Sequence, residues 1–71
     1  MKTVLDKISD NYPESDKELL FAAYRYAEEM HEGQQRASGE PYFVHTSAVA
    51  EILIDLGMDT ASVAAAFLHD V

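Results

Sequence analysis

One short sequence motif could bind a metal ion. The chain contains 3 histidines, and His69 is followed directly by Asp70. Neighbouring residues lie about 100° apart around a helix axis, so both side chains can reach a metal ion off one edge of the helix. An imidazole beside a carboxylate suits Mn(II), Fe(II), Zn(II) or Co(II), and not copper(I) or a cluster. Because His-Asp pairs are common by chance, the pair predicts a metal site only together with a further ligand.

His45 is the candidate for that further ligand. It shares a helical stripe with Val49, Ile52 and Leu56, which predicts that its imidazole points inward. Taken alone, an inward histidine is more often a hydrogen-bonded core residue than a ligand. With the His-Asp pair it completes a set of two imidazoles and one carboxylate. A hard metal usually needs waters or further carboxylates in addition to such a set.

Arg36 is the candidate for binding an anion. A guanidinium binds phosphate in a bidentate manner and stacks on flat rings, and Tyr42 nearby could add a stacking face. The alternative for Arg36 is a solvated cation in an acidic protein. His31, near the end of its predicted helix, is expected to be structural or to complement the helix dipole.

The elements that must position these residues are all predicted to be helices. No segment alternates between polar and apolar residues for long enough to predict a strand, so the expected fold class is all-α in one small domain. A short helical lead comes first, with a capping-box pattern of Thr3 and Asp6, and three main helices follow. The predicted ranges are Thr3 to Asn11, Ser15 to Glu32, Pro41 to Leu56, and from Asp59 or Thr60 to the end.

Start and stop signals set these boundaries. Ser15, with Glu18 three residues later, is the predicted cap of the first main helix, whose inward residues are Leu20, Ala23 or Tyr24, Ala27, and Met30 or His31. Gly33 is predicted to end that helix. Pro41 is predicted as the first residue of the next helix, because its fixed φ suits that position.

Composition excludes several classes of protein. The chain has 71 residues with 13 acidic and 5 basic side chains, and its formal net charge of -8 argues against binding nucleic acid. The absence of cysteine excludes disulfides, cysteine-ligated zinc and thiol catalysis. No apolar run is long enough for a membrane span, and the start lacks a signal-peptide core, so a cytoplasmic protein is expected. A domain this small is marginally stable.

Four motifs together carry a resemblance to a known family. They are Ala27-x-x-x-His31-x-Gly33-Gln34-x-Arg36, Ser38-Gly39-Glu40-Pro41-Tyr42-x-x-His45, Val49-Ala50-x-Ile52-Leu53 and Ala65-Ala66-x-Leu68-His69-Asp70-Val71. With these spacings, the stretch from Ala27 to Val71 resembles the N-terminal hydrolase domain of the RelA/SpoT-type alarmone enzymes. Those enzymes belong to the wider His-Asp metal-dependent phosphohydrolase superfamily.

The resemblance implies an all-helical domain with one metal ion, usually Mn(II). Its members remove the 3′-pyrophosphate from guanosine tetra- and pentaphosphate in the stringent response. By this likeness His45, His69 and Asp70 are the metal ligands, and Arg36 grips the guanine nucleotide with Tyr42 beside it. Longer members also carry a synthetase domain with GTP pyrophosphokinase activity, which nothing in these 71 residues matches.

The sequence departs from the family pattern at several positions. The family continues past His-Asp-Val into a Glu-Asp pair linked to the catalytic water, and a further aspartate completes the metal site. These acids would lie beyond Val71, so no catalytic residue is assigned within the chain. Ala37 stands where the family often has lysine, and Thr46 where it commonly has proline.

Two main hypotheses remain at this point, and a third is a plain acidic helical bundle whose histidines have no function. In the first, residues 1–71 are the N-terminal portion of an alarmone hydrolase domain, and the isolated chain has little or no activity. The apolar final helix, which stops in mid-pattern, favours this hypothesis. In the second, the chain is a complete, non-catalytic acidic helical module that self-associates or binds a partner protein.

Overall fold

Four helices make up the part of the chain that the structure describes. The computed structural model describes residues 3–69. The helices are α1 (Val4–Asn11), α2 (Glu14–Met30), α3 (Tyr42–Asp55) and α4 (Thr60–Leu68). Since residues 3–69 contain no strand, the predicted all-α fold is confirmed. Among these residues, no helix is both long enough and apolar enough to span a membrane.

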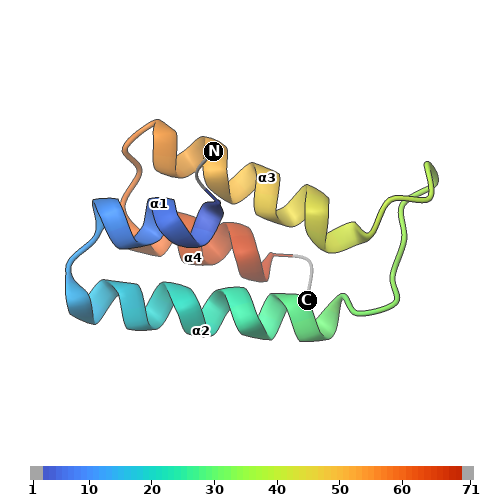
Figure 1. Cartoon of the computed structure of the whole chain (residues 1–71), viewed down its shortest axis with the longest axis horizontal. Coiled ribbons are helices and arrows are strands. Elements are labelled where there is room, and N and C mark those ends of the chain that lie inside the picture. Colours follow the sequence, from blue (N-terminus) through green and yellow to red (C-terminus); the bar gives the residue numbers. More distant parts are fainter. Residues whose placement is uncertain (1–2, 70–71) are drawn as a thin grey trace.

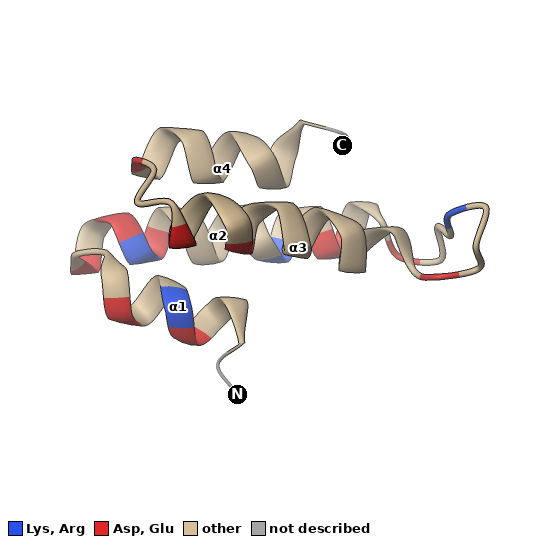
Figure 2. Cartoon of the chain, turned by 90° about the horizontal axis from the view of Figure 1, so that it is seen from above, with Lys and Arg blue, Asp and Glu red and all other residues tan. Residues whose placement is uncertain are grey.

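The helices form a small bundle around α2 and α3. Figures 1 and 2 show α1 on one side of this pair and α4 on the other. Both flanking helices contact both members of the pair, and α4 makes the more extensive contacts. This arrangement explains why α4, with the sequence TASVAAAFL, carries no charge: small apolar residues let it pack closely on two helices at once.

Aromatic rings lie at the centre of the hydrophobic core. Phe67 of α4 is fully buried, and the ring of Tyr24 meets it edge to face at 5.7 Å between centroids. Tyr24 also meets Phe43 of α3 at 5.0 Å, so it connects three helices. The buried apolar residues are Val4, Ile8, Leu20, Ala23, Ala27, Ala50, Ile54, Val63, Ala64, Ala66 and Phe67.

Of the four predicted helix starts, two are confirmed, one is wrong, and one is displaced by a residue, since Pro41 is the N-cap of α3 rather than its first residue. The side chains and backbones of Thr3 and Asp6 exchange hydrogen bonds of 3.2 Å at the start of α1. Asp59 caps α4 by accepting a 2.9 Å bond from the backbone of Ser62. Ser15, however, is not a cap. Helix α2 begins at Glu14 behind Pro13, because the fixed φ of proline already suits a helix entry and proline brings no N–H that needs a partner.

The buried face of α3 is also not the predicted one. The buried residues are Thr46, Ala50 and Ile54, whereas Ile52 is 57% exposed and Leu56 is 66% exposed. Apolar residues lie on more than one side of this helix, so two stripes satisfy the same spacing. Helices α1 and α4 cover the stripe that contains small Ala50, where two backbones can approach closely.

Polar contacts hold α1 and its following turn against the far end of α3. The ammonium of Lys7 lies 2.9 Å from Asp55 and 3.4 Å from Glu51. Its hydrogen bond with Asp55 is the main cause that raises the pKa of Lys7. The hydroxyl of Tyr12 donates a 2.8 Å bond to the carbonyl of Met58, in the turn before α4.

Candidate functional site

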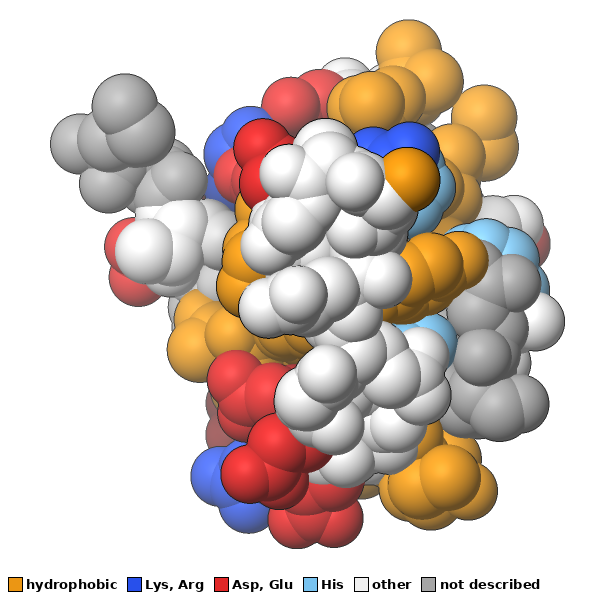
Figure 3. Space-filling model, turned by 90° about the vertical axis from the view of Figure 1, so that its right-hand side faces the viewer, with side chains coloured by type: hydrophobic (Ala, Val, Ile, Leu, Met, Phe, Trp, Pro, Cys, Tyr) orange, Lys and Arg blue, Asp and Glu red, His pale blue; other side chains and the backbone are white. Residues whose placement is uncertain are grey.

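All 3 histidines lie at one end of the bundle. His31 is the C-cap of α2, His45 is in the first turn of α3, and His69 is the C-cap of α4. Helix α3 runs opposite to α2 and α4, so its start meets their ends (Figure 1). Figure 3 views the molecule from this end and shows histidine side chains gathered away from the densest group of carboxylates.

A hairpin-like loop projects beyond the helices at the same end (Figure 1). Its two arms pair through an isolated bridge between Gln35 and Pro41 and a 2.9 Å bond from the Arg36 amide to the Glu40 carbonyl. At the tip, the amide of Gly39 donates a 2.8 Å bond to the Arg36 carbonyl. Gly39 has φ +89°, which glycine adopts without strain. The segment between α2 and α3 is therefore a hairpin-like loop that carries the exposed Arg36.

A column of rings joins the base of this hairpin to His45. The imidazole of His31 stacks on the ring of Tyr42, with 4.7 Å between centroids and 30° between planes. Tyr42 in turn meets His45 nearly edge to face at 6.0 Å and 74°. Helix α3 places Tyr42 and His45 on one face because they are three residues apart.

His31 is buried, with 3% of its surface exposed. The Gln34 side-chain amide donates a 3.0 Å bond to the Met30 carbonyl, and this bond turns the amide oxygen of Gln34 toward His31. His31 Nδ1 donates a 3.1 Å bond to that oxygen. Nε2 is also buried and has no hydrogen-bond partner among the described residues. The expectation of a structural His31 fits this burial.

His69 is held in one tautomer by the backbone. Its Nδ1 lies 2.6 Å from the carbonyl oxygen of Ala66, which can only accept, so Nδ1 carries the proton. Nε2 is then the ring nitrogen with the lone pair. Histidines that bind metals are commonly oriented in this way, by donating the other ring N–H to a carbonyl.

The predicted metal ligands are placed only in part. His45 is half-buried at the surface rather than directed into the core, because the buried stripe of α3 is the neighbouring one. His69 is exposed at the end of α4. Asp70 lies outside the described residues. Within residues 3–69, no group of three or more His, Cys, Asp or Glu side chains is arranged to hold a metal ion.

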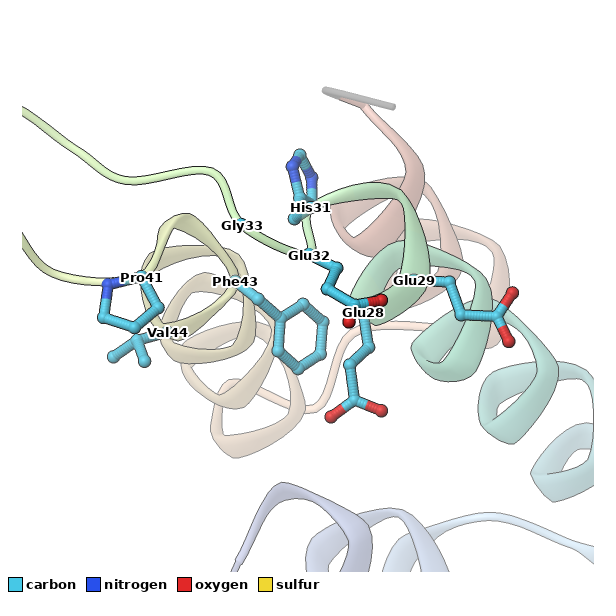
Figure 4. A pocket seen from close by; sticks show the side chains of 8 residues that line it. All are labelled: Glu28, Glu29, His31, Glu32, Gly33, Pro41, Phe43 and Val44. Atoms are coloured by element: carbon cyan, nitrogen blue, oxygen red, sulfur yellow. The ribbon is translucent and has the colours of Figure 1, made fainter.

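A pocket of about 460 Å³ lies beside the hairpin, between the end of α2 and the start of α3. Its charged lining consists of Glu28, Glu29 and Glu32. In Figure 4 the carboxylates of Glu28 and Glu29 point away from the His31 ring. Burial, and then the charge of Glu28, raise the pKa of the nearby Tyr24 hydroxyl. A pocket lined by these carboxylates is unfavourable for a polyphosphate.

The part played by Gln34 was not predicted from the sequence. Its side chain fixes His31, and its carbonyl accepts a 2.9 Å bond from the Tyr42 amide at the start of α3. The only available signal was the spacing of three residues between His31 and Gln34, which suits a side-chain contact at the end of a helix.

Comparison with known proteins finds a matching family and relatives over most of the chain. The HD domain family matches residues 23–71. The chain is 51% identical over 59 residues to the bifunctional (p)ppGpp synthase/hydrolase RelA of Mycobacterium tuberculosis, covering 83% of this chain and 8% of that protein. It is 43% identical over 67 residues to the GTP pyrophosphokinase rsh of Brucella melitensis, covering 94% of this chain and 9% of that protein. A GTP pyrophosphokinase of Myxococcus xanthus is 44% identical over 63 residues, which are 89% of this chain and 8% of that protein.

The fold and the site define a class of protein, an all-helical bundle with its histidines at one end. The chain belongs to the HD domain family, among relatives of the RelA and Rsh enzymes of (p)ppGpp metabolism. It spans less than a tenth of the length of these relatives, with 8% of the first and 9% of the second.

Proposed function

We propose that residues 1–71 form the N-terminal portion of an HD-type hydrolase domain that removes the 3′-pyrophosphate from guanosine tetra- or pentaphosphate. The observation that carries this proposal is the position of His45 and His69 at one end of the bundle, beside a hairpin that carries Arg36. The relatives' names, a (p)ppGpp synthase/hydrolase and GTP pyrophosphokinases, support the guanine nucleotide as substrate.

The donor set fits a divalent metal ion such as Mn(II). His45, His69 and Asp70 would hold it, with one carboxylate and two imidazoles as its protein ligands. Such an ion offsets phosphate charge and lowers the pKa of a bound water. With Nδ1 donating to the Ala66 carbonyl, Nε2 is the nitrogen of His69 that would coordinate such an ion.

Arg36 and Tyr42 would bind the nucleotide. In a chain of net charge -8, a polyphosphate needs a local cation, and the guanidinium of Arg36 can pair with two phosphate oxygens at once. Arg36 belongs to the hairpin whose base is bonded to the start of α3, the helix that carries Tyr42 and His45. An anion held there avoids the three glutamates of the neighbouring pocket.

Paramagnetic broadening by Mn(II) tests the metal ligands in the chain as it stands. We expect weak binding, in about the micromolar to millimolar range, with selective broadening of the His45 and His69 ring signals. His45→Ala should abolish the broadening at His69. Glu29→Gln, on the acidic pocket, is the matched control and should leave it unchanged. Broadening spread evenly over the acidic surface, and insensitive to His45→Ala, would show adventitious binding and contradict the proposal.

Binding of guanosine tetraphosphate tests the nucleotide site separately. In the presence of Mn(II), the tetraphosphate should shift the amide signals of residues 34–42 more than GDP does, because GDP lacks the 3′-pyrophosphate. Arg36→Ala should remove most of this difference, whereas Arg25→Ala on α2 should not. Equal shifts with both nucleotides would contradict a site for the 3′-pyrophosphate. No release of pyrophosphate above background is expected from the 71-residue chain.

The exposed apolar face of α3 favours a second candidate function. Ile52 and Leu56 are more than half exposed, and burial of such a stripe would stabilise contact with a second copy of the chain. Under this proposal the chain is a self-associating module. Sedimentation at increasing concentration should show a dimer that Ile52→Glu disrupts. A chain that stays monomeric at high concentration would exclude the module.

A further inference from the structure

We propose that His31 is a positioning residue, which holds the Arg36 hairpin and the His45 ring in register by stacking on Tyr42. The inference rests on the proposed function for the roles of Arg36 and His45. It assigns to His31 no contact with metal or nucleotide, since its ring is buried at the end of α2.

The hydrogen bonding of His31 indicates that its ring is not there for stability alone. A buried imidazole nitrogen without a partner costs free energy, and Nε2 has none among the described residues. A phenylalanine would fill a similar space at no such cost. The ring nitrogen that does bond, Nδ1, is used to fix Gln34, which belongs to the hairpin.

Two hydrogen bonds connect Gln34, at the start of the hairpin, to His31. Its carbonyl accepts a 2.9 Å bond from the Gln34 amide, and its imidazole bonds the Gln34 side chain. The Gln34 carbonyl then accepts the bond from Tyr42 that closes the base of the hairpin. Residues 32–40, which include Arg36, are all exposed, so the direction of the hairpin depends on this base.

The contacts on the other side lead to His45. One face of the Tyr42 ring lies against His31 at 4.7 Å, and the Tyr42–His45 pair follows at 6.0 Å. The stack restricts rotation of Tyr42, and the restricted ring limits the rotamers of a half-buried His45. A ligand held in one orientation binds a metal more tightly than one that rotates, and loss of such support typically costs about 10- to 100-fold in affinity.

Three variants of the 71-residue chain separate positioning from packing. His31→Leu fills the space without a flat face, and His31→Phe restores the flat face without the bond to Gln34. Ile54→Val trims the core of α3 far from the hairpin and controls for a general loss of stability. The readouts are the ring-proton shifts of His45 at one fixed pH, amide exchange at Tyr42, and the Mn(II) dissociation constant.

We expect His31→Leu to move the His45 ring shifts and to speed Tyr42 amide exchange by about tenfold or more. The Mn(II) dissociation constant should rise by about tenfold or more in the same variant. His31→Phe should restore the His45 shifts, and Ile54→Val should leave them unchanged. If His31→Leu does not fold, Tyr42→Leu removes the same stack from its less buried side and should give the same changes.

Two outcomes would overturn the proposal. If His31→Leu behaves as Ile54→Val does in every readout, His31 is an ordinary core residue. If His31→Phe fails to restore the His45 shifts, stacking is not what holds the ring. The shift and exchange readouts need neither metal nor nucleotide. Failure of Mn(II) to bind the wild-type chain would therefore count against the proposed function. The shift and exchange readouts would still decide the positioning role.

Discussion

Replacing Thr46 with valine should stabilise the protein. Thr46 lies on the buried face of α3 with 0% of its surface exposed. Its hydroxyl oxygen is buried and has no hydrogen-bond partner among residues 3–69. Valine has nearly the same shape and a similar helix propensity, so the substitution removes the hydroxyl and changes little else.

The size of the effect follows from the cost of an unpaired buried group. Burial of a polar group without a hydrogen bond costs about 1–3 kcal/mol. We take about 1–2 kcal/mol as the increase in the free energy of unfolding, since the backbone around the hydroxyl relaxes in part. For a domain of 71 residues, about 1 kcal/mol shifts Tm by about 7 °C. Thr46→Val should therefore raise Tm by about 7–14 °C.

Thermal and urea unfolding followed by circular dichroism measure this change. The urea midpoint should rise while the slope m stays the same, because the surface exposed on unfolding is unchanged. Thr46→Ser is the matched control: it keeps the hydroxyl, loses the buried methyl, and should lower Tm. A Thr46→Val protein that is less stable than the wild type would refute the reasoning, since it would mean that the hydroxyl is hydrogen bonded in solution.

Substitutions at three further residues test a helix cap, the core and one tertiary hydrogen bond. The bond to Ser62 lowers the pKa of Asp59. The stability that this bond contributes is present above the unfolded pKa of about 4 and is lost as pH falls through the folded pKa. Asp59→Asn keeps the cap, so the acid unfolding curve of this variant should lack that loss. Phe67→Ala should cost about 3–5 kcal/mol of unfolding free energy and Phe67→Leu much less, and equal losses in urea titrations would argue against a tightly packed ring. Tyr12→Phe removes the bond to the Met58 carbonyl and should cost about 0.5–1.5 kcal/mol. Burial raises the pKa of Tyr12, so wild-type stability should fall above about pH 10, and Tyr12→Phe should flatten that fall in a pH series of melts.

Local signals were sufficient to predict the helices. The capping pair of Thr3 and Asp6, and the Asp59 cap, depend only on residues within one turn, and both are present in the structure. The end of the second helix is displaced from the prediction, with α2 finishing at Met30 rather than at Glu32. Of the alternatives left open on that helix, Ala23 and His31 are buried and Met30 is exposed.

The buried face of α3 could not be predicted from spacing alone. Val49, Ile52 and Leu56 form as regular a stripe as Thr46, Ala50 and Ile54. Which of the two stripes is buried depends on the side of α3 that α1 and α4 occupy. The positions of α1 and α4 depend in turn on the turn before α4 and on the Tyr12 bond to Met58. Size decides in favour of the second stripe, because a close helix approach needs the small Ala50 at its centre.

The structure adds the environment of each histidine to the roles that the sequence assigned. All 3 histidines lie at one end because consecutive helices of the bundle reverse direction. Their environments differ. His31 is buried, and one of its ring nitrogens bonds Gln34. His69 is exposed, and a carbonyl fixes its tautomer. His45 is intermediate in exposure and lies against Tyr42. His31 is buried with Nδ1 bonded to Gln34, which suits a supporting role, whereas the less buried His45 and His69 are the ligands to test.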